Sequence, residues 1–364
     1  MIDAHWGEGG PLSLGVEEEV MILDATTHEP VPAVATLLAE VEGTPLPGRL
    51  KTELHASVVE LNTDVCADAG EALAAVRALR DAADEGARAH GLRIAAAGAH
   101  PTAPSESLEI VPEDRYLEML ETIGHTARRQ GVNGLHVHVG MPDGDTCLRT
   151  LEAVLPWLPV VLALSANSPF LAGEDTGFAS NRAPILAELP RSGAPPPLAS
   201  YAEWERYVER LGALHAPADY TSFWWDVRPH PRFGTLELRI ADQPTAVERT
   251  AAFVALLQAL CAAAREHEPV RPDATSRAVY QQNRWSAARF GPAALLVTEA
   301  LDRRIPASEL GAELLELVRP AAERLGSAAL LDAIDPWTCE ADAQRAVGVA
   351  SAAADLVQRT VRSR

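Results

Sequence analysis

The segment Ser13–Leu23, SLGVEEEVMIL, decides the fold, because it reads as a β-strand with acidic residues at regular intervals. Side chains on a strand point to alternate faces, so Glu17 and Glu19 lie on the same face. The opposite face carries Val16, Glu18 and Val20. Two neighbouring carboxylates repel each other unless a cation lies between them. The strand therefore has one face for packing and one face that is suited to a cation.

Three more segments combine an apolar face with a polar one in the same way. They are Ser57–Thr63 (SVVELNT), Leu135–Gly140 (LHVHVG) and Thr235–Ile240 (TLELRI). Their polar residues are Glu60, the pair His136 and His138, and the pair Glu237 and Arg239. Any one such strand is typical of an antiparallel sheet with one solvated face. Solvated faces usually carry Lys, Thr, Ser and Gln as well, however, whereas a cluster of glutamates with one or two histidines is suited to Mg²⁺ or Mn²⁺.

Glu53 fits this pattern less simply. It lies seven residues before Glu60, an odd spacing that puts the two side chains on opposite faces of an unbroken strand. Either Glu53 precedes the strand in a turn near His55, or a bulge intervenes. Both alternatives are compatible with the sequence.

The rest of the chain mixes strands and helices without a regular βαβ rhythm. Asp68 and Glu71 form a capping-box-like start for a helix that ends at Gly91. Residues 167–200 are rich in Pro, Gly and polar groups, and the pattern from Ala246 onward is helical almost to the end. No G-x-G-x-x-G or G-x-x-x-x-G-K-[ST] motif is present, which argues against a dinucleotide fold and a P-loop. The sequence predicts an α+β fold in one domain, residues 1–364, with an antiparallel or mixed sheet and a helical C-terminal third.

Composition argues against several classes of partner. The chain has 51 Asp and Glu against 31 Lys and Arg, a formal net charge of −20 and a pI near 4.9, which disfavours nucleic acids and anionic membranes. Lys51 is the only lysine, and the arginine excess is typical of a high-GC genome. The four cysteines form no C-x-x-C pair, and the N-terminus lacks the basic start and apolar run of a signal peptide. We therefore expect a cytoplasmic protein.

An ordered set of motifs runs through the chain. The motifs are GVEEE (15–19), Glu53 with VELNT (59–63), GLHVHVG (134–140), SANSPF (165–170), DTGF (175–178), WDVR (225–228), LELR (236–239) and NRWSAARFG (283–291). Together they resemble the glutamate–cysteine ligase type 2 family, the bacterial carboxylate–amine ligases, from about residue 12 to about residue 295. Beyond residue 300 the resemblance is limited to helical character.

The resemblance implies a glutamine-synthetase/guanido-kinase-like catalytic fold, a curved and mainly antiparallel sheet backed by helices. It also implies ATP, Mg²⁺ with Mn²⁺ as an alternative, and small amino-acid and amine substrates that are joined through an acyl phosphate. The family's metal pattern falls on Glu17, Glu19, Glu53, Glu60, His136 and Glu237. The alternation of side chains independently selects all of these except Glu53.

Further roles follow from the resemblance and from side-chain chemistry. Arg239, beside the catalytic Glu237, is expected to contact the γ-phosphate or the transition state, because a guanidinium binds phosphate bidentately. His138 is expected to face the nucleotide. Arg182 and Arg228 are candidates for binding a substrate carboxylate.

Trp225 and Asn167 are further candidates for substrate binding, each with a structural alternative. Asn167 follows a helix and would also suit a cap or turn, and Trp225 would also suit the core beside a structural Asp–Arg pair. The loop Gly173–Pro197 is interpreted as a lid over the amino-acid donor, with Arg182 at the donor's α-carboxylate. The alternative is a solvated loop with an incidental arginine.

Two other functions are compatible with the same motifs. A Mg²⁺-dependent phosphotransferase on this fold would give a phosphorylated product and no amide. A non-catalytic nucleotide-binding relative would be expected to have lost acids, whereas all six metal-pattern residues are intact. A homodimer is one expectation for the assembly.

Overall fold

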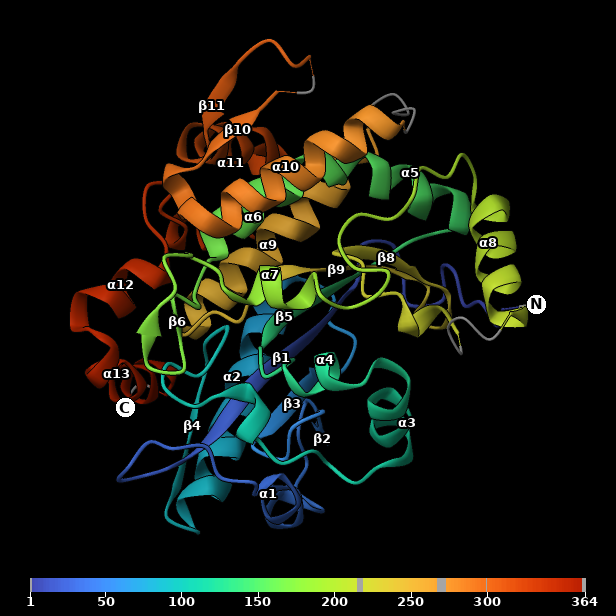
Figure 1. Cartoon of the computed structure of the whole chain (residues 1–364). Helices are drawn as coiled ribbons and strands as arrows, with labels where there is room; N and C mark the ends of the chain where they lie inside the picture. The colour runs from blue at the N-terminus through green and yellow to red at the C-terminus, as the bar shows by residue number, and fades with distance from the viewer. Residues whose placement is uncertain (1, 215–218, 267–272, 299, 362–364) are drawn as a thin grey trace.

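A seven-stranded antiparallel sheet forms the centre of the molecule (Figure 1). The computed structural model describes residues 2–214, 219–266, 273–298 and 300–361. The strands follow the order β2-β3-β1-β5-β9-β8, and β4 also pairs with β1. Their bounds are β1 Leu14–Asp24, β2 Gly48–Thr52, β3 Val58–Thr63, β4 Leu92–Ala95, β5 Gly134–Gly140, β8 Val227–His230 and β9 Thr235–Asp242. The strands predicted at 13–23, 57–63, 135–140 and 235–240 are therefore all present.

The register of the sheet sets polar residues of neighbouring strands side by side. The facing pairs are Glu19 with Glu60, Glu17 with His136, and His138 with Glu237. The register between β5 and β9 shifts between Leu135 and Val137. Because facing residues of antiparallel strands lie on the same side of the sheet, these pairs form one continuous polar face.

Helices α2 (Ala69–Arg88) and α9 (Val247–Ala264) are among those that pack against the opposite face of the sheet. Asp68 caps α2, because its side chain accepts hydrogen bonds from Gly70 N at 2.8 Å and Glu71 N at 2.9 Å. This confirms the predicted start of the helix.

An acid also lies on the packed face. Glu18 is fully buried, and its carboxylate accepts hydrogen bonds from Arg80 Nε and Nη2 of α2, both at 2.7 Å. Thr250 of α9 donates to the same carboxylate at 2.6 Å. The ion pair and the hydroxyl together satisfy a charge that would otherwise be very costly to bury.

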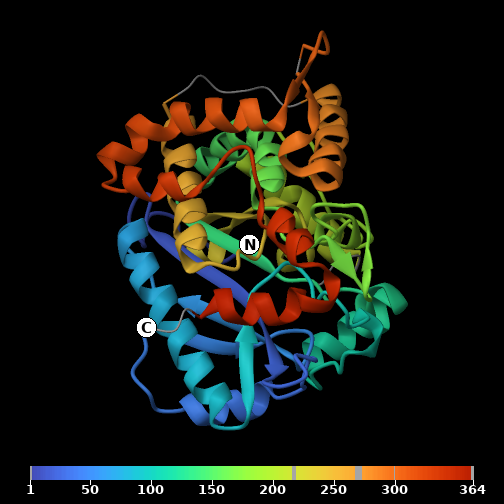
Figure 2. The same cartoon turned by 90° about the vertical axis from the view of Figure 1, so that its left-hand side faces the viewer.

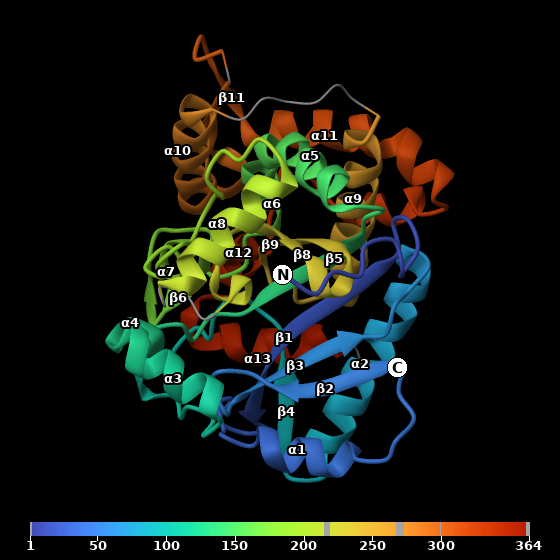
Figure 3. The same cartoon turned by 90° about the vertical axis from the view of Figure 1, so that its right-hand side faces the viewer.

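The other helices surround this core. They are α1 Val34–Val41, α3 Asp114–Ile123, α4 His125–Arg128, α5 Gly144–Val154, α6 Leu158–Ser165, α7 Arg182–Leu186, α8 Tyr201–Ala213, α10 Ala274–Phe290, α11 Ala307–Arg324, α12 Glu340–Val347 and α13 Val349–Thr360. In Figure 1, α10 and α11 lie above the sheet, and α1 lies below it. Figure 2 shows α13 near β4, where Thr360 Oγ1 accepts a hydrogen bond of 2.8 Å from Ala96 N. Figure 3 shows β1, β3 and β2 in succession, with α3 and α4 beside them.

Three segments differ from the sequence-based expectation. The helix expected over 147–164 is divided between α5 and α6 by a 3₁₀ turn at Leu155–Trp157, where Pro156 lacks a backbone N–H. Residues 167–200, expected to be irregular, contain α7 and the strands β6 Phe170–Leu171 and β7 Glu174–Asp175. The helical tail contains a hairpin of β10 Leu295–Val297 and β11 Arg304–Pro306. These elements are too short to show a periodic pattern in the sequence.

Two helical stretches are long and apolar enough to span a membrane, Gly144–Ser165 and Val247–Ala264. In their most apolar windows, 78% and 72% of the residues are buried inside the protein. Because most of each window is buried in the protein, both stretches are core helices. The assignment of the whole chain to one domain stays a prediction.

Candidate active site

One face of the sheet carries a row of charged and imidazole side chains. The row consists of Glu60 from β3, Glu17 and Glu19 from β1, His136 and His138 from β5, Glu237 and Arg239 from β9, and Arg228 from β8. The residues that alternate with them along each strand are apolar and buried, except Glu18, which is buried but paired with Arg80. The residues that the two-residue repeat of the strands assigned to a polar face therefore lie together in space.

Three groups of the row face one another closely enough to share a metal ion. Glu17, His138 and Glu237 each offer one ligand atom, and these atoms lie within 4.8 Å of one another. His138 Nε2 lies 3.5 Å from Glu17 Oε1 and 4.0 Å from Glu237 Oε1, and it is buried without a hydrogen bond. Its other ring nitrogen, Nδ1, is hydrogen-bonded to Thr235 Oγ1 at 2.9 Å. A buried, unpartnered nitrogen directed at two carboxylates fits a divalent cation.

The electrostatics of this group favour ionised carboxylates. Burial opposes charge on Glu17, but the hydrogen bond with His136 and the nearby His138 imidazole outweigh it and hold its pKa well below the ordinary value. Burial likewise opposes charge on His138, but the facing Glu17 and Glu237 raise its pKa. Glu17 can therefore bind a cation without first losing a carboxyl proton, whereas His138 must give up the proton that its raised pKa favours before Nε2 can coordinate the ion.

His136, which the resemblance assigns to the metal, lies beside this group. Its Nδ1 is 3.2 Å from Glu17 Oε2 and its Nε2 is 3.8 Å from Glu19 Oε1. Burial, followed by the nearby Arg239, lowers the pKa of His136 to about 4, so the imidazole is neutral. His138, which was expected to face the nucleotide, thus belongs to the group with Glu17 and Glu237. His136 lies between Glu17 and Glu19.

A second group of carboxylates lies on the β2 side of the row. Glu53 follows β2 in the turn before β3, and its Oε1 accepts a hydrogen bond of 2.8 Å from Leu54 N. The first of the two alternatives for Glu53 is therefore correct, and no bulge is needed. Burial and then the charges of Glu19 and Glu60 raise the pKa of Glu53 well above the ordinary value.

Glu19 and Glu60 share this crowding. Burial raises the pKa of Glu19 to about 7, although Arg182 and the hydrogen bond from Gly134 N oppose the shift. Burial and the charge of Glu17 raise the pKa of Glu60. Carboxylates that resist ionisation because they are buried and close to one another are the donor set that a hard divalent cation stabilises. The oxygen-rich composition of this group fits Mg²⁺ or Mn²⁺ better than Zn²⁺.

Arginines close the other side of the row. Glu237 forms ion pairs with both Arg228 and Arg239. Burial opposes the charge of Glu237, but Arg228 and Arg239 outweigh it and hold its pKa well below the ordinary value. Arg228 also donates to the carbonyl oxygens of Thr221 and Phe223, at 2.6 and 3.1 Å. Arg239 is less enclosed, with a side chain 20% exposed, and is the more available of the two for phosphate.

Asn167 and Trp225 are both buried among protein groups, and their substrate contacts stay predictions. Asn167 is fully buried, and its Nδ2 donates to the carbonyl of Gln243 and to Thr245 Oγ1, both at 2.9 Å. Trp225 is buried and packs on Phe223, with ring centroids 4.8 Å apart. These contacts are the ones that the structural alternatives describe, a turn after a helix for Asn167 and a core aromatic for Trp225.

Arg182 is buried, so the alternative of an incidental arginine on a solvated loop is wrong, while its contact with the donor carboxylate stays a prediction. It begins α7, is 3% exposed, and donates to the carbonyl oxygens of Arg239 at 3.0 Å and Ile240 at 3.2 Å. The loop folds back onto the sheet because Asp242 of β9 accepts hydrogen bonds from the hydroxyls of Ser168 and Ser180, at 2.6 and 2.7 Å. Arg182 thus holds the main chain of β9 next to Arg239.

Asp226, which the sequence offered as part of a structural Asp–Arg pair, is a positioning residue whose arginine partner is Arg284. Its carboxylate accepts hydrogen bonds from Tyr280 Oη at 2.7 Å and Arg284 Nε at 2.6 Å, and its carbonyl accepts one from Arg239 N at 2.8 Å. Arg284 belongs to the NRWSAARFG motif, so the available signal was the co-occurrence of this motif with WDVR. Through Asp226, α10 supports the backbone that carries Arg239.

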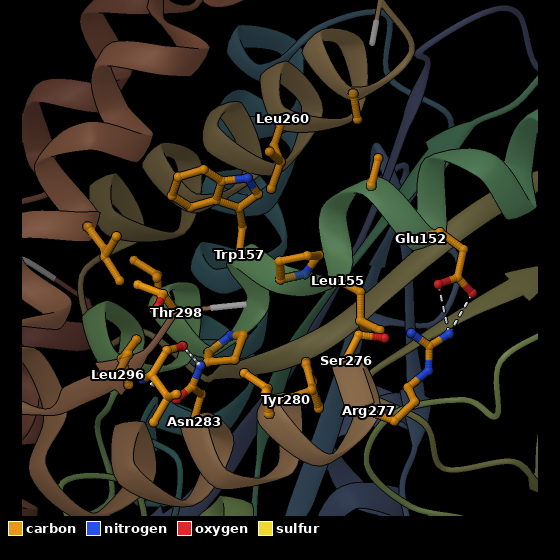
Figure 4. Close-up of a pocket in the computed structure, with 18 of the residues that line it drawn as sticks. Glu152, Leu155, Trp157, Leu260, Ser276, Arg277, Tyr280, Asn283, Leu296 and Thr298 are labelled. Atoms are coloured by element: carbon orange, nitrogen blue, oxygen red, sulfur yellow. Dashed lines mark hydrogen bonds and ion pairs between the residues drawn. The ribbon is translucent and has the colours of Figure 1, made fainter. Parts of the chain in front are cut away.

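A cavity of about 540 Å³ lies elsewhere, among α5, α6, α9, α10 and α11. Figure 4 shows its mainly apolar lining, with Trp157, Leu260 and Leu296. At one end Glu152 accepts hydrogen bonds from Arg277 Nη2 at 2.6 and 2.8 Å. None of the residues in the polar row lines this cavity.

Comparison with known proteins agrees with the geometry of the row. The family model of glutamate–cysteine ligase family 2 matches residues 13–351. The chain belongs to this family. Membership makes it an ATP-dependent ligase that forms a carbon–nitrogen bond.

Relatives within the family match over most of their length. A Rubrobacter xylanophilus protein named "Putative glutamate--cysteine ligase 2-3" is 41% identical over 349 residues, which cover 95% of each chain. A Herpetosiphon aurantiacus protein named "Putative glutamate--cysteine ligase 2" is 40% identical over 329 residues, which cover 89% of this chain and 85% of that one.

Solved structures confirm the fold. The glutamate–cysteine ligase of Francisella tularensis, solved in complex with AMP, has a TM-score of 0.67 at 13% identity and covers 96% of this chain and 88% of its own. A bifunctional glutathione synthetase from Pasteurella multocida has a TM-score of 0.63 at 17% identity, and the match covers 96% of this chain and 52% of that one. The predicted glutamine-synthetase-like α+β fold is thus confirmed.

Proposed function

We propose that this ligase activates the γ-carboxylate of glutamate with ATP and transfers the acyl group to the amine of cysteine. The observation that carries the proposal is the row of acids, histidines and arginines on one face of five adjacent strands in a chain that belongs to glutamate–cysteine ligase family 2. The names of its relatives support glutamate and cysteine as the substrates.

One group of side chains lies close enough to share a divalent cation, and a second has the oxygen-rich composition that suits one. Glu17, His138 and Glu237 would hold one ion, and Glu19, Glu53 and Glu60 would hold another. When bound, Mg²⁺ or Mn²⁺ would neutralise the oxygens of the ATP phosphates.

The reaction needs a phosphoryl transfer because a carboxylate is a poor acyl donor. Attack of the carboxylate oxygen on the γ-phosphorus gives an acyl phosphate and ADP, and the amine then displaces phosphate. The protein contributes positioning and charge stabilisation more than covalent chemistry. Arg239, partly exposed at the edge of the row, is suited to contact the transferred phosphoryl group, while Arg228 orients Glu237.

An aromatic surface lies next to His138 and is suited to the purine of ATP. Phe233 is 53% exposed, stacks on His230 with centroids 4.2 Å apart, and lies 5.5 Å from the His138 ring. Exposed aromatic faces stack on nucleobases. This surface supports the expected nucleotide contact on the His138 side of the row.

The test is an amine screen with the purified chain, ATP, Mg²⁺ and glutamate. Amine-dependent phosphate release should be strongest with cysteine, and mass spectrometry should find the γ-glutamyl amide. A phosphorylated product without amide would instead indicate a phosphotransferase, and ATP binding without phosphate release would indicate a non-catalytic relative. The cytoplasmic location and the homodimer also remain proposals, and the mass in solution tests the second.

A further inference from the structure

Lys51 occupies the β2 end of the polar row. It lies directly opposite Glu60 in the β2–β3 register, and its Nζ is 3.5 Å from Glu60 Oε1. The side chain of Lys51 is 41% exposed, whereas that of Glu60 is 15% exposed. The ammonium group therefore lies at the open side of the carboxylate group formed by Glu19, Glu53 and Glu60.

This lysine differs from the arginines of the site in how firmly it is held. Arg228 and Arg182 each donate to two main-chain carbonyls, so their guanidinium groups are fixed. Lys51 forms a long ion pair in a partly solvated position, and such pairs contribute little free energy. It is also the only lysine, while the other 30 of the 31 basic residues are arginines. A compact ammonium on a flexible stem can change partners more easily than a planar guanidinium.

We propose that Lys51 exchanges partners during the reaction. Before a cation binds, its ammonium group neutralises Glu60. When a divalent cation binds Glu60 with Glu19 and Glu53, it repels Lys51, which then binds an anionic oxygen of a substrate. That oxygen belongs to an ATP phosphate or to the carboxylate of the amino-acid donor. The inference rests on the proposed function for its metal group and substrates, and it adds a substrate-contacting residue.

The unique lysine makes the exchange directly measurable without turnover. Trinitrobenzenesulfonate modifies free amines, and peptide mass spectrometry separates Lys51 from the N-terminal amine. Mg²⁺ alone should raise the modification rate of Lys51 about two- to fivefold, the factor that corresponds to release from a partly exposed ion pair. Mg²⁺ with a non-hydrolysable ATP analogue, or Mg²⁺ with glutamate, should then lower it again.

The two arms identify the source of the oxygen. Protection by the ATP analogue indicates a phosphate contact, and protection by glutamate indicates a carboxylate contact. A rate that does not change with Mg²⁺, or a Mg²⁺-induced rate that neither ligand lowers, overturns the proposal. Exchange without amide formation in the amine screen would leave the Lys51 inference standing and count only against the proposed function.

A matched control uses an ion pair far from the row. Arg319 of α11 pairs with Asp332 at 3.4 Å, with side chains 45% and 70% exposed. In the variant Lys51→Arg/Arg319→Lys, the single lysine should react at the same rate under all conditions. A Mg²⁺ response of this lysine would show that the effect is not specific to Lys51 and would overturn the proposal.

Kinetics supply a second readout. Lys51→Met should raise the KM of the protected ligand roughly ten- to hundredfold, the range of a lost hydrogen bond to a charged group, with an unchanged melting temperature. Lys51→Arg should recover part of the loss because the charge is kept. An unchanged KM for both ligands in Lys51→Met contradicts a substrate contact.

Discussion

Glu60 and Glu237 carry the same functional group but have opposite acidities. Glu237 lies between two arginines, and after burial these guanidinium groups are the main influence that keeps its pKa well below the ordinary value. Glu60 lies among other carboxylates, and burial followed by Glu17 raises its pKa. At the scale of single residues, neighbours from other strands therefore decide which acid is permanently charged and which one needs a cation.

Removing either acid should abolish most turnover. We expect Glu60→Ala and Glu237→Ala to lower Mg²⁺-dependent phosphate release roughly 100- to 1000-fold, the range seen when one group that stabilises transition-state charge is lost. The physical reason is that phosphate oxygens lose their screening and the neighbouring charges are no longer balanced. Phosphate release measured over a range of Mg²⁺ or Mn²⁺ concentrations checks this, with Glu316→Ala on the exposed face of α11 as the control.

The two variants should differ in stability. Glu60→Ala should keep its melting temperature, because it removes a crowded carboxylate. Glu237→Ala leaves Arg228 and Arg239 without their buried partner and should lose about 3–5 kcal/mol of unfolding free energy, so Glu237→Gln is the better kinetic probe. Near wild-type turnover in both alanine variants would refute the metal assignment.

At the scale of elements, α7 and β9 form one unit. Arg182 at the start of α7 donates to two consecutive carbonyls of β9, and Asp242 at the end of β9 binds Ser168 and Ser180 on the chain that leads into α7. The segment thus stabilises the strand that carries Arg239, a role that a pattern of Gly, Pro and polar residues does not reveal.

Arg182→Ala should therefore act through structure, not through one substrate. We expect a lower melting temperature and a lower kcat, with KM changes of similar size for ATP and for the amino-acid donor, because β9 itself is displaced. Arg182→Lys should rescue little, since an ammonium cannot donate to both carbonyls in the same fixed geometry. A selective rise in the donor KM at unchanged stability would instead support the predicted carboxylate contact.

The contact between β1 and α2 depends on a buried ion pair. Arg80→Leu should lose about 3–5 kcal/mol of unfolding free energy, because Glu18 is left charged and fully buried. The double variant Glu18→Met/Arg80→Leu should lose less than the single one, since no unpaired charge remains. Urea unfolding measures both, with Arg319→Ala at an exposed ion pair as the control. Equal losses of unfolding free energy for Arg80→Leu and Arg319→Ala would show that the buried ion pair matters no more for stability than an exposed one.

At the scale of the whole molecule, all strands of the row contribute to one reaction. An isotope label shows whether this reaction passes through an acyl phosphate. With ¹⁸O in the donor carboxylate, one labelled oxygen should appear in the released phosphate, because an acyl phosphate passes that oxygen on. Mass spectrometry of the phosphate checks this, and a reaction without amine gives the background of uncoupled hydrolysis. Amide formation with unlabelled phosphate would exclude carboxylate phosphorylation.

Much of this site could be predicted from the sequence because its signals are local. The two-residue repeat of strands placed Glu17 with Glu19 and Glu237 with Arg239 on common faces, and the cap at Asp68 located the start of α2. Family motifs then supplied Glu53, whose odd spacing the periodicity did not explain.

Only the tertiary structure decided which groups meet. The partner of Glu18 lies 62 residues away and that of Lys51 lies across a strand pair, and Arg182 is bound to residues 57 and 58 positions further along the chain. His138, not only His136, faces Glu17 and Glu237 because the β5–β9 register sets that distance. Backbone preferences act over a few residues and are legible in sequence, whereas partners, burial and acidity depend on which distant elements pack together.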